Sequence, residues 1–203
     1  MFNYTDDSLS LHTDLYQINM LKTYWDDNTA DRQAVFEAYF RKNPFENGYA
    51  VFAGLERIVQ YLSNLRFSKT DIEYLESLDL YPQEFLDYLR DFKFTCTVRS
   101  LVEGELCFAN EPLIQIEGPL GQCQIVETAV LNILNFQTLI ATKASRMRSV
   151  IGENDKLSEF GTRRAQEMEA AIWGTRAAYI GGFDSTSNVR AGKLFGIPVS
   201  GTH

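Results

Sequence analysis

The 203-residue sequence has few of the residues that build metal centres or disulfide scaffolds. It contains two histidines and three cysteines, and the cysteines (Cys96, Cys107 and Cys123) lack CxxC spacing. A zinc site is therefore not expected, and this cysteine usage favours a reducing cytoplasm. No apolar run approaches the roughly 18 residues of a membrane span, and the first residues lack the features of a signal peptide. We expect a cytoplasmic protein with no membrane segment and no metal site of its own.

Basic charge is also scarce, except in one part of the chain. Residues 1–142 carry ten basic and 21 acidic side chains, a balance of −11, whereas residues 143–203 carry nine basic and six acidic ones, a balance of +3. An acidic chain without a basic stripe argues against nucleic acid as a partner. The basic residues of the last third indicate either an anionic ligand or a solvated helix face, and charge alone leaves both open.

The first 120 residues predict an α+β, sandwich-like domain with a sheet of its own. Residues 34–41 alternate between apolar and polar faces, as a half-buried strand does. Helical periodicity begins near Thr13. Ser68 is a suitable N-cap for a later helix, and Pro82 suits the first turn of the helix after that. The further helices are predicted at 54–65, 69–78 and 82–92, and the further strands at 94–98, 106–109 and 113–117.

Residues 121–203 predict a different architecture. Apolar periodicity predicts one long helix that ends at Gly152 and links the two domains. Beyond it, strands alternate with helices, which is typical of a parallel sheet or barrel. The strands are predicted at 157–160, 179–183 and 197–200, and the helices at 165–178 and 186–195. A complete barrel of this kind has about 250 residues. We therefore expect an α/β fold in which this region holds only the first strand–helix units of an incomplete TIM-like barrel.

Each of the three predicted strands runs into a cluster of small and polar residues. The clusters are Gly161–Arg164, Asp184–Asn188 and Gly201–His203. The carboxyl ends of parallel strands share one face, and ligands bind there. Arg163 offers a guanidinium to a carboxylate or phosphate beside a helix start, or else pairs with Glu167 or Glu169. The hydroxyls of Ser185–Ser187 either bind an anion or cap the next helix.

Four motifs, in order along the chain, resemble those of the nicotinate phosphoribosyltransferases. They are Thr13–Gln17, Glu159–Arg164, Gly181–Gly192 and Ile197–His203. The resemblance implies an enzyme that joins nicotinate to phosphoribosyl pyrophosphate, releasing pyrophosphate and forming nicotinate mononucleotide in the first step of NAD salvage. It also implies ATP as a co-substrate, Mg²⁺ to neutralise phosphate charge, and a homodimer with a shared active site.

The family motifs also imply which residues bind substrate. These residues are Tyr16, Phe160, Arg163, Ser185, Ser187 and Thr202. Phe160 and Tyr16 would sandwich the pyridine ring, with Tyr16 reaching across from a partner subunit. Arg163 would bind the ribose phosphate or the carboxylate, and Thr202 would lie near the base with a hydroxyl from Ser185 or Ser187.

The catalytic histidine implied by the family is not among these residues. His203 occupies the x position of a Gly-Thr-x-Ala-His-Ser motif, so the phosphorylated histidine would fall two residues further on. We expect this 203-residue chain alone to lack turnover. The alternatives are a relative that uses nicotinamide or quinolinate, and a non-catalytic anion-binding or interaction fragment. Nicotinamide users carry an acidic residue around Ser187, so the serine favours nicotinate.

Overall fold

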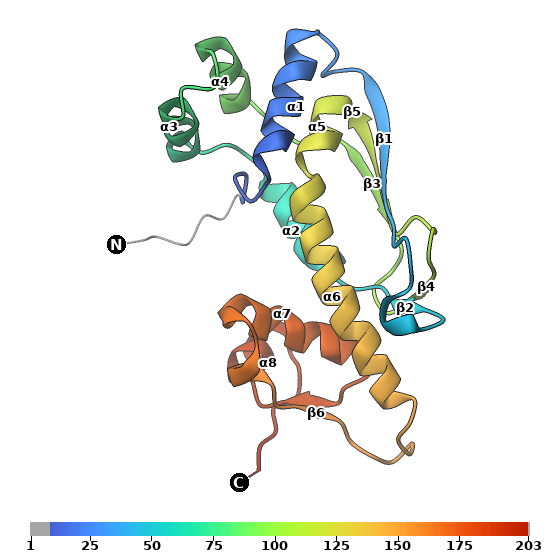
Figure 1. Ribbon diagram of the computed structural model, residues 1–203. Helices are drawn as coiled ribbons and strands as arrows, with labels where there is room; N and C mark the ends of the chain where they lie inside the picture. Colours follow the sequence, from blue (N-terminus) through green and yellow to red (C-terminus); the bar gives the residue numbers. More distant parts are fainter. Residues whose placement is uncertain (1–8, 203) are drawn as a thin grey trace. The chain divides into compact units, whose positions relative to one another are not determined.

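The computed structural model describes residues 9–202 and falls into two compact units. The first comprises residues 9–38, 56–100 and 114–132, and the second comprises residues 39–55, 101–113 and 133–202. Figure 1 follows the chain through both by colour, from blue to red. Each unit therefore assembles three separate stretches of sequence, and the mixed α/β content expected from the sequence is confirmed.

In the first unit, the described residues form an antiparallel sheet of three strands. The strands lie in the order β1 (Gln33–Ala38), β5 (Ile114–Pro119) and β3 (Thr97–Ser100). Ile116 of β5 lies opposite both Phe36 and Val98. Alternate residues of β5 are buried, as expected for a strand with one face on the core. The strands predicted at 34–41 and 113–117 are confirmed in position, with shifts of a few residues at their ends.

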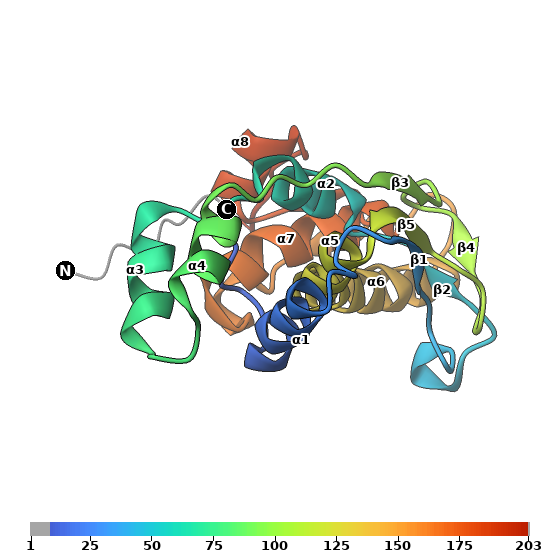
Figure 2. The same cartoon turned by 90° about the horizontal axis from the view of Figure 1, so that it is seen from above.

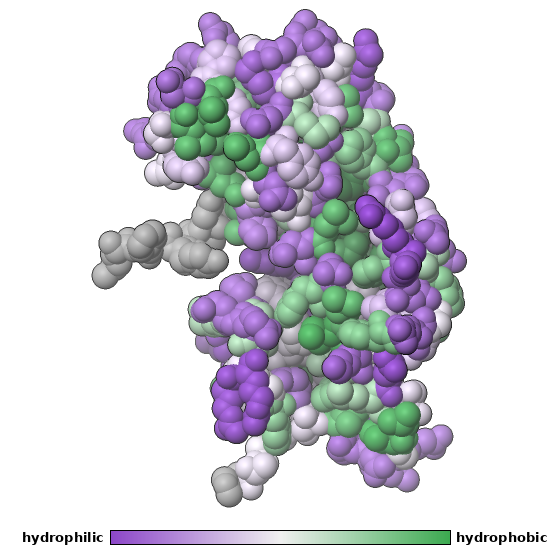
Figure 3. All heavy atoms as spheres, in the orientation of Figure 1, coloured by the Kyte–Doolittle hydropathy of each residue, from purple (hydrophilic) through white to green (hydrophobic). Residues whose placement is uncertain are grey.

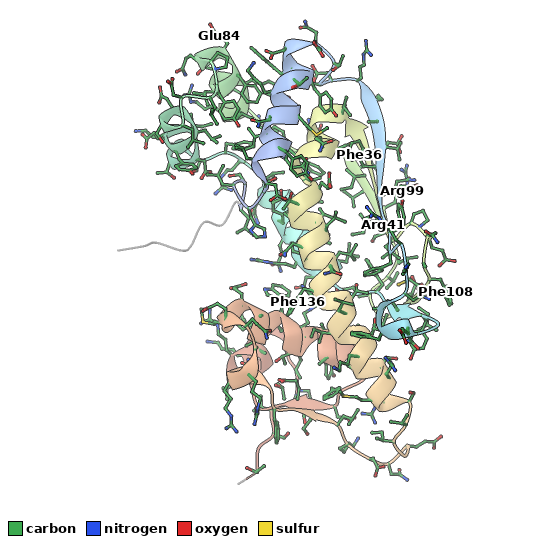
Figure 4. The ribbon with its side chains drawn as sticks, in the orientation of Figure 1. Phe36, Arg41, Glu84, Arg99, Phe108 and Phe136 are labelled. Carbon is green, nitrogen blue, oxygen red and sulfur yellow. The ribbon has the colours of Figure 1, made fainter. Side chains whose placement is uncertain are left out.

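The strand predicted at 94–98 is displaced to Thr97–Ser100. The side chain of Gln122 explains the shift, because its Oε1 accepts the Thr95 backbone amide at 2.7 Å and removes that residue from the ladder. Arg99, labelled in Figure 4, instead lies on β3 and pairs with Glu117 of β5 at 2.6 Å. Hydrogen bonding by a distant side chain has thus set where this strand begins.

The helices of the first unit begin at or near the expected positions. They are α1 (Leu15–Asp26), α2 (Leu55–Asn64), α3 (Lys69–Ser77), α4 (Gln83–Arg90) and α5 (Leu120–Ile125). Asp14, rather than Thr13, is the N-cap of α1. Ser68 and Asp71 form the capping box of α3, and Pro82 is the N-cap of α4. The sequence therefore placed the helix starts to within about one residue, which is the usual uncertainty of such boundaries.

Helices α1 and α5 lie side by side, as both Figure 1 and Figure 2 show. Gly121 allows this approach, since a Cβ at that position would lie 2.5 Å from Cδ1 of Leu21. Phe36, labelled in Figure 4, lines an apolar groove of about 250 Å³ with Cys123, Val126 and Val130. Figure 3 shows apolar side chains exposed over this part of the unit.

The long helix predicted through residues 121–151 is wrong in two details. It is divided at Val126 into α5 and α6 (Glu127–Arg148). Buried Gln124 and the Glu127 carboxylate bind Gln17 of α1 on either side of this break. The helix also stops three residues early. Val150 is 81% exposed, so a further turn through this residue would gain no stability from packing.

In the second unit, small residues bring the backbone close to α6. Strand β2 (Ala50–Val51) pairs with β4 (Leu106–Cys107) in an antiparallel ladder. Val51 packs with Ala141 and Ala177, and the Thr142 hydroxyl of α6 accepts the Val51 amide at 2.9 Å. The buried hydroxyl therefore satisfies a backbone group that would otherwise be costly to bury.

An ion pair shielded from solvent ties three stretches of this unit together. Glu103 receives two hydrogen bonds from Arg176, at 2.9 and 2.6 Å, and both side chains are only 15% exposed. The same carboxylate accepts the backbone amides of Gly54 and Leu55 at 2.7 and 3.0 Å. Desolvation raises the pKa of Glu103, but Arg176 and these amides outweigh it and hold the pKa below its usual value.

The strand–helix alternation predicted after residue 155 is confirmed, and its strands are parallel. Strand β6 (Ser158–Glu159) pairs with β7 (Ser185–Thr186), and Thr186 forms a parallel bridge with Val199. Helices α7 (Glu167–Ile180) and α8 (Val189–Phe195) connect them. Among the described residues no helix is long and apolar enough to cross a membrane.

The second strand of this set is not where the sequence predicted it. Residues 179–183 were expected to form it, but Tyr179 and Ile180 complete the last turn of α7. Ile180 packs on the alanine-rich core, so its burial favours the helix. The strand is instead the polar pair Ser185–Thr186, whose backbone is bonded on both sides: Thr186 donates to Pro198 at 3.0 Å and Ser187 donates to Glu159 at 3.0 Å.

We predict that Gly181→Ala destabilises the second unit. A Cβ at Gly181 would lie 2.6 Å from the Ala144 Cβ and would clash with the Ala141 carbonyl oxygen, so α6 and α7 must separate at a cost of roughly 1–3 kcal/mol. Urea unfolding of the purified protein measures the change. Gly48→Ala is the matched control, because nothing lies within 4 Å of its added Cβ. Equal stability of the two variants would contradict the assigned packing.

Candidate functional site

The end of β6 leads into an exposed turn that carries an aromatic ring and two arginines. Phe160 is 41% exposed, and Thr162–Arg164 forms a 3-10 turn, labelled η2, before α7 begins at Glu167. Arg164 donates to the Phe160 carbonyl at 3.4 Å. Arg163 is exposed. Its guanidinium is therefore available to an anion.

Three serine hydroxyls, one from each parallel strand segment, meet beside this turn. Ser185 lies 2.7 Å from Ser158 and 2.8 Å from Ser200, and the latter two are 3.4 Å apart, all measured between Oγ atoms. We call these three residues the serine cluster. It gathers hydroxyls that can donate to or accept from a polar ligand group. The cluster shows that the three parallel strand segments lie side by side, although Ser158 and Ser185 are the first residues of β6 and β7.

The other polar residues of the strand ends have different surroundings. Ser187 is exposed, and its backbone amide donates to the Glu159 carbonyl. Thr202 is also exposed, two residues beyond the serine cluster. Asn188 caps α8 by accepting the Ala191 amide at 3.0 Å. The cap is therefore an asparagine and not one of the Ser185–Ser187 hydroxyls, and the helix starts at Val189 and not at the predicted residue 186. His203 lies outside the described residues.

Glu159 lies under the exposed turn and bonds to several elements. One carboxylate oxygen, Oε1, accepts the Gly161 amide. The other, Oε2, accepts the hydroxyls of Thr175 from α7 and Thr186 from β7, each at 2.9 Å. Sequence reasoning assigned no role to this carboxylate, although it begins the Glu159–Arg164 motif. Ser158 and Ser200 were also missed.

Arg148, at the end of α6, holds the amino-terminal side of the strand segments. Its Nε donates to the Gly182 carbonyl at 2.8 Å, and its Nη2 pairs with Asp184. Asp184 also accepts the Leu157 amide at 2.8 Å. This amide bond, followed by the Arg148 bond, lowers the pKa of Asp184 below its ordinary value of 3.8. One charged pair thus connects the starts of β6 and β7.

Tyr16 belongs to the first unit and lies in a separate polar network. Its hydroxyl donates to Glu127 at 3.2 Å and accepts from Gln17 at 2.8 Å. Asp14 bonds to Thr128 and His12 to Asn132, so the motif around residue 14 faces the start of α6. Desolvation, followed by the nearby Glu127 charge, raises the pKa of Tyr16. The ring remains 47% exposed and available for stacking.

Comparison with known proteins identifies the family. Residues 11–135 match the model of the nicotinate phosphoribosyltransferase (NAPRTase) N-terminal domain, which is more than half of the chain. The chain therefore belongs to the nicotinate phosphoribosyltransferase family, as the four sequence motifs indicated. The match covers the Tyr16 motif and ends before Phe160, so it supports the first unit more directly than the strand ends.

The relatives extend this likeness over the whole chain. A nicotinate phosphoribosyltransferase of Bacillus subtilis is 59% identical over 202 residues, which are 100% of this chain and 41% of that protein. The crystal structure of human nicotinic acid phosphoribosyltransferase superposes with a TM-score of 0.88 at 40% identity, over 94% of this chain and 39% of that one. The present chain thus spans about two fifths of the length of these relatives.

A more distant structure shows the same fold. Nicotinate-nucleotide pyrophosphorylase from Pyrococcus furiosus superposes with a TM-score of 0.77 over 100% of this chain and 44% of that one. Its sequence identity is 23%. The arrangement of helices and strands is therefore retained where most side chains differ.

The depressed pKa of Asp184 gives a pH prediction. A carboxylate whose pKa is lowered in the folded state stabilises that state above its unfolded pKa, and this contribution is lost as the pH falls through the folded pKa. We expect Asp184→Asn to lower the thermal unfolding midpoint at pH 7, and the gap to wild type to close as the pH falls below about 3.8. Calorimetry against pH measures it, with exposed Glu153→Gln as control. A gap that widens on acidification would contradict the assignment.

Proposed function

We propose that the native protein carrying this chain is a nicotinate phosphoribosyltransferase. The reaction joins nicotinate to phosphoribosyl pyrophosphate and yields nicotinate mononucleotide and pyrophosphate, coupled to ATP hydrolysis, as the first step of NAD salvage. One observation carries the proposal: three parallel strand segments and the turn after β6 bring an exposed aromatic ring, an exposed arginine and the serine cluster to one part of the second unit. Family membership supports the same reaction.

The residues suit the charges and shape of the substrates. Nicotinate is a flat aromatic acid, which an aromatic ring binds by stacking and a guanidinium binds through its carboxylate. In this proposal Phe160 stacks on one face of the pyridine ring, and Tyr16 of a partner subunit stacks on the other. Arg163 binds the nicotinate carboxylate or the ribose phosphate. Thr202 lies near the base, together with the hydroxyl of Ser185 or Ser187.

Departure of pyrophosphate leaves positive character on the ribose, so positioning and neutralisation of phosphate charge supply the catalysis. We propose ATP as co-substrate and Mg²⁺ as the ion that accompanies the phosphates. Among residues 9–202 no group of three His, Cys, Asp or Glu side chains is arranged to hold a metal ion. The contribution we propose for the described residues is to hold the base and an anionic group.

The remaining parts of the proposal concern the whole protein. Residues 121–203 would form the linking helix and the first strand–helix units of an α/β barrel. The rest of that barrel would correspond to the additional length of the relatives, as would the phosphorylated histidine expected beyond His203. The proposed enzyme is a cytoplasmic homodimer with a shared active site, and the 203-residue chain alone has no turnover.

We expect the native protein to form nicotinate mononucleotide from nicotinate, phosphoribosyl pyrophosphate, ATP and Mg²⁺. Arg163→Ala should weaken binding of one anionic ligand about 10- to 100-fold, because a hydrogen bond to a charged group contributes roughly 1.5–3 kcal/mol. Titration calorimetry with each ligand separately identifies which group Arg163 binds. Lys193→Ala removes an exposed positive charge elsewhere in the same unit and serves as control. Native protein that binds nicotinate but never forms product would favour a non-catalytic anion-binding protein.

The choice of acid over amide gives a separate prediction. A carboxylate placed near the base repels nicotinate and not neutral nicotinamide. We expect Ser187→Asp to raise the KM for nicotinate at least about fivefold relative to nicotinamide, since like charges at close range cost more than 1 kcal/mol. Initial rates with both bases measure the ratio, and Ser187→Ala controls for loss of the hydroxyl. Wild-type protein that prefers nicotinamide or quinolinate would overturn the assignment of nicotinate.

A further inference from the structure

We infer that Glu159 is a positioning residue that fixes the Phe160–Arg164 turn in the orientation needed to bind the base. This inference rests on the proposed function for what the turn binds, and on geometry alone for what holds the turn. Glu159 is partly buried directly beneath Phe160, at the last residue of β6. The Glu159 carboxylate bonds to α7 and β7, whereas the following Phe160 is 41% exposed.

The carboxylate connects the turn to two elements that are themselves well fixed. Thr175 is 2% exposed on α7, and Thr186 is 1% exposed on β7. Both hydroxyl oxygens lie 2.9 Å from Oε2 of Glu159, and the Thr175 hydroxyl shares its hydrogen with the Ala171 carbonyl at 2.8 Å. Oε1 accepts the Gly161 amide inside the turn. A shift of the turn would break the amide bond, whereas a shift of the carboxylate would break both hydroxyl bonds.

The backbone around Glu159 extends this support to the next helix. The Glu159 carbonyl accepts the Ser187 amide at 3.0 Å. The Thr186 hydroxyl, besides donating to the carboxylate, accepts the Asn188 amide at 3.0 Å, and Asn188 caps α8. One side chain therefore links the turn with α7, β7 and the start of α8, so the positions of Phe160 and Ser185 are set together.

The turn also requires a residue without a side chain beside this carboxylate. A Cβ at Gly161 would lie 2.7 Å from Oε1 of Glu159, closer than real Cβ contacts come. The small residue and the carboxylate thus fit as a pair: the glycine lets the acceptor reach the amide, and the acceptor determines where the turn runs. Sites held by such supporting hydrogen bonds lose affinity when the support is removed, even though the ligand contacts remain.

The experiment compares Glu159→Gln and Glu159→Ala with wild type in the native protein. Glutamine keeps one acceptor for Gly161 but places an amide group, a donor, against the two threonine hydroxyls; alanine removes every bond. Exposed Glu153→Ala, in the same unit, is the matched control. Amide hydrogen exchange of residues 160–164 without ligand, thermal midpoints, and KM and kcat for nicotinate are measured for each variant.

We expect exchange in residues 160–164 to accelerate about tenfold in Glu159→Ala, the factor that corresponds to loss of one hydrogen bond, and less in Glu159→Gln. The KM for nicotinate should rise in the same order. Lower thermal stability with unchanged exchange in the turn and unchanged KM would overturn the inference, because it would leave Glu159 a purely structural role.

Two further outcomes are separable. If Glu159→Ala does not fold, Glu159→Gln alone decides between faster and unchanged exchange. If wild-type protein neither binds nor converts nicotinate, the proposed function fails, and the exchange rates still decide whether Glu159 holds the turn. Faster exchange confined to residues 160–164 then supports the positioning role, and exchange like that of Glu153→Ala overturns it.

Discussion

The second unit depends on the partly buried ion pair between Glu103 and Arg176. The pair closes a connection among three stretches that are far apart in sequence, because Glu103 also accepts the amides of Gly54 and Leu55. Removing one partner from such a pair leaves a shielded charge uncompensated, which is far more costly than losing an exposed pair. The α7 helix that carries Arg176 also supplies Thr175 to the Glu159 network. The position of α7, and with it that of the candidate site, therefore depends on the Glu103–Arg176 ion pair, which lies outside the site.

Much of the fold could be predicted from local sequence signals. Periodicity and caps located the helices, as Ser68 shows for α3, and alternation located β1 and β5. The errors arose where distant residues decided the local structure. Gln122 binds the backbone of Thr95 and displaces the start of β3. Burial of Ile180 against alanines extends α7 through a segment that was predicted to be a strand. The short strand Ser185–Thr186 lacks the apolar alternation that located β1 and β5, although threonine itself favours strands.

The candidate site was predictable in outline and not in detail. Polar clusters after successive strand segments indicated a shared face, and the serine cluster shows that these segments do converge. The supporting residues were not predictable, because Glu159 and Arg148 act through partners 16 to 36 positions away. The sequence alone does not show whether a carboxylate faces water or accepts three hydrogen bonds. Only the packing of α7 against the strand segments distinguishes these two cases.

The central position of β5 has a consequence for synthesis of the chain. Strands β1 and β3 both pair with β5 and not with each other, so the sheet of the first unit has no ladder until residues 114–119 have left the ribosome. At about 5–20 residues per second, β1 then waits several seconds with both edges unpaired. Unpaired edges invite association with other chains. The nascent protein is therefore most exposed to aggregation, and most in need of a chaperone, between the emergence of β1 and that of β5.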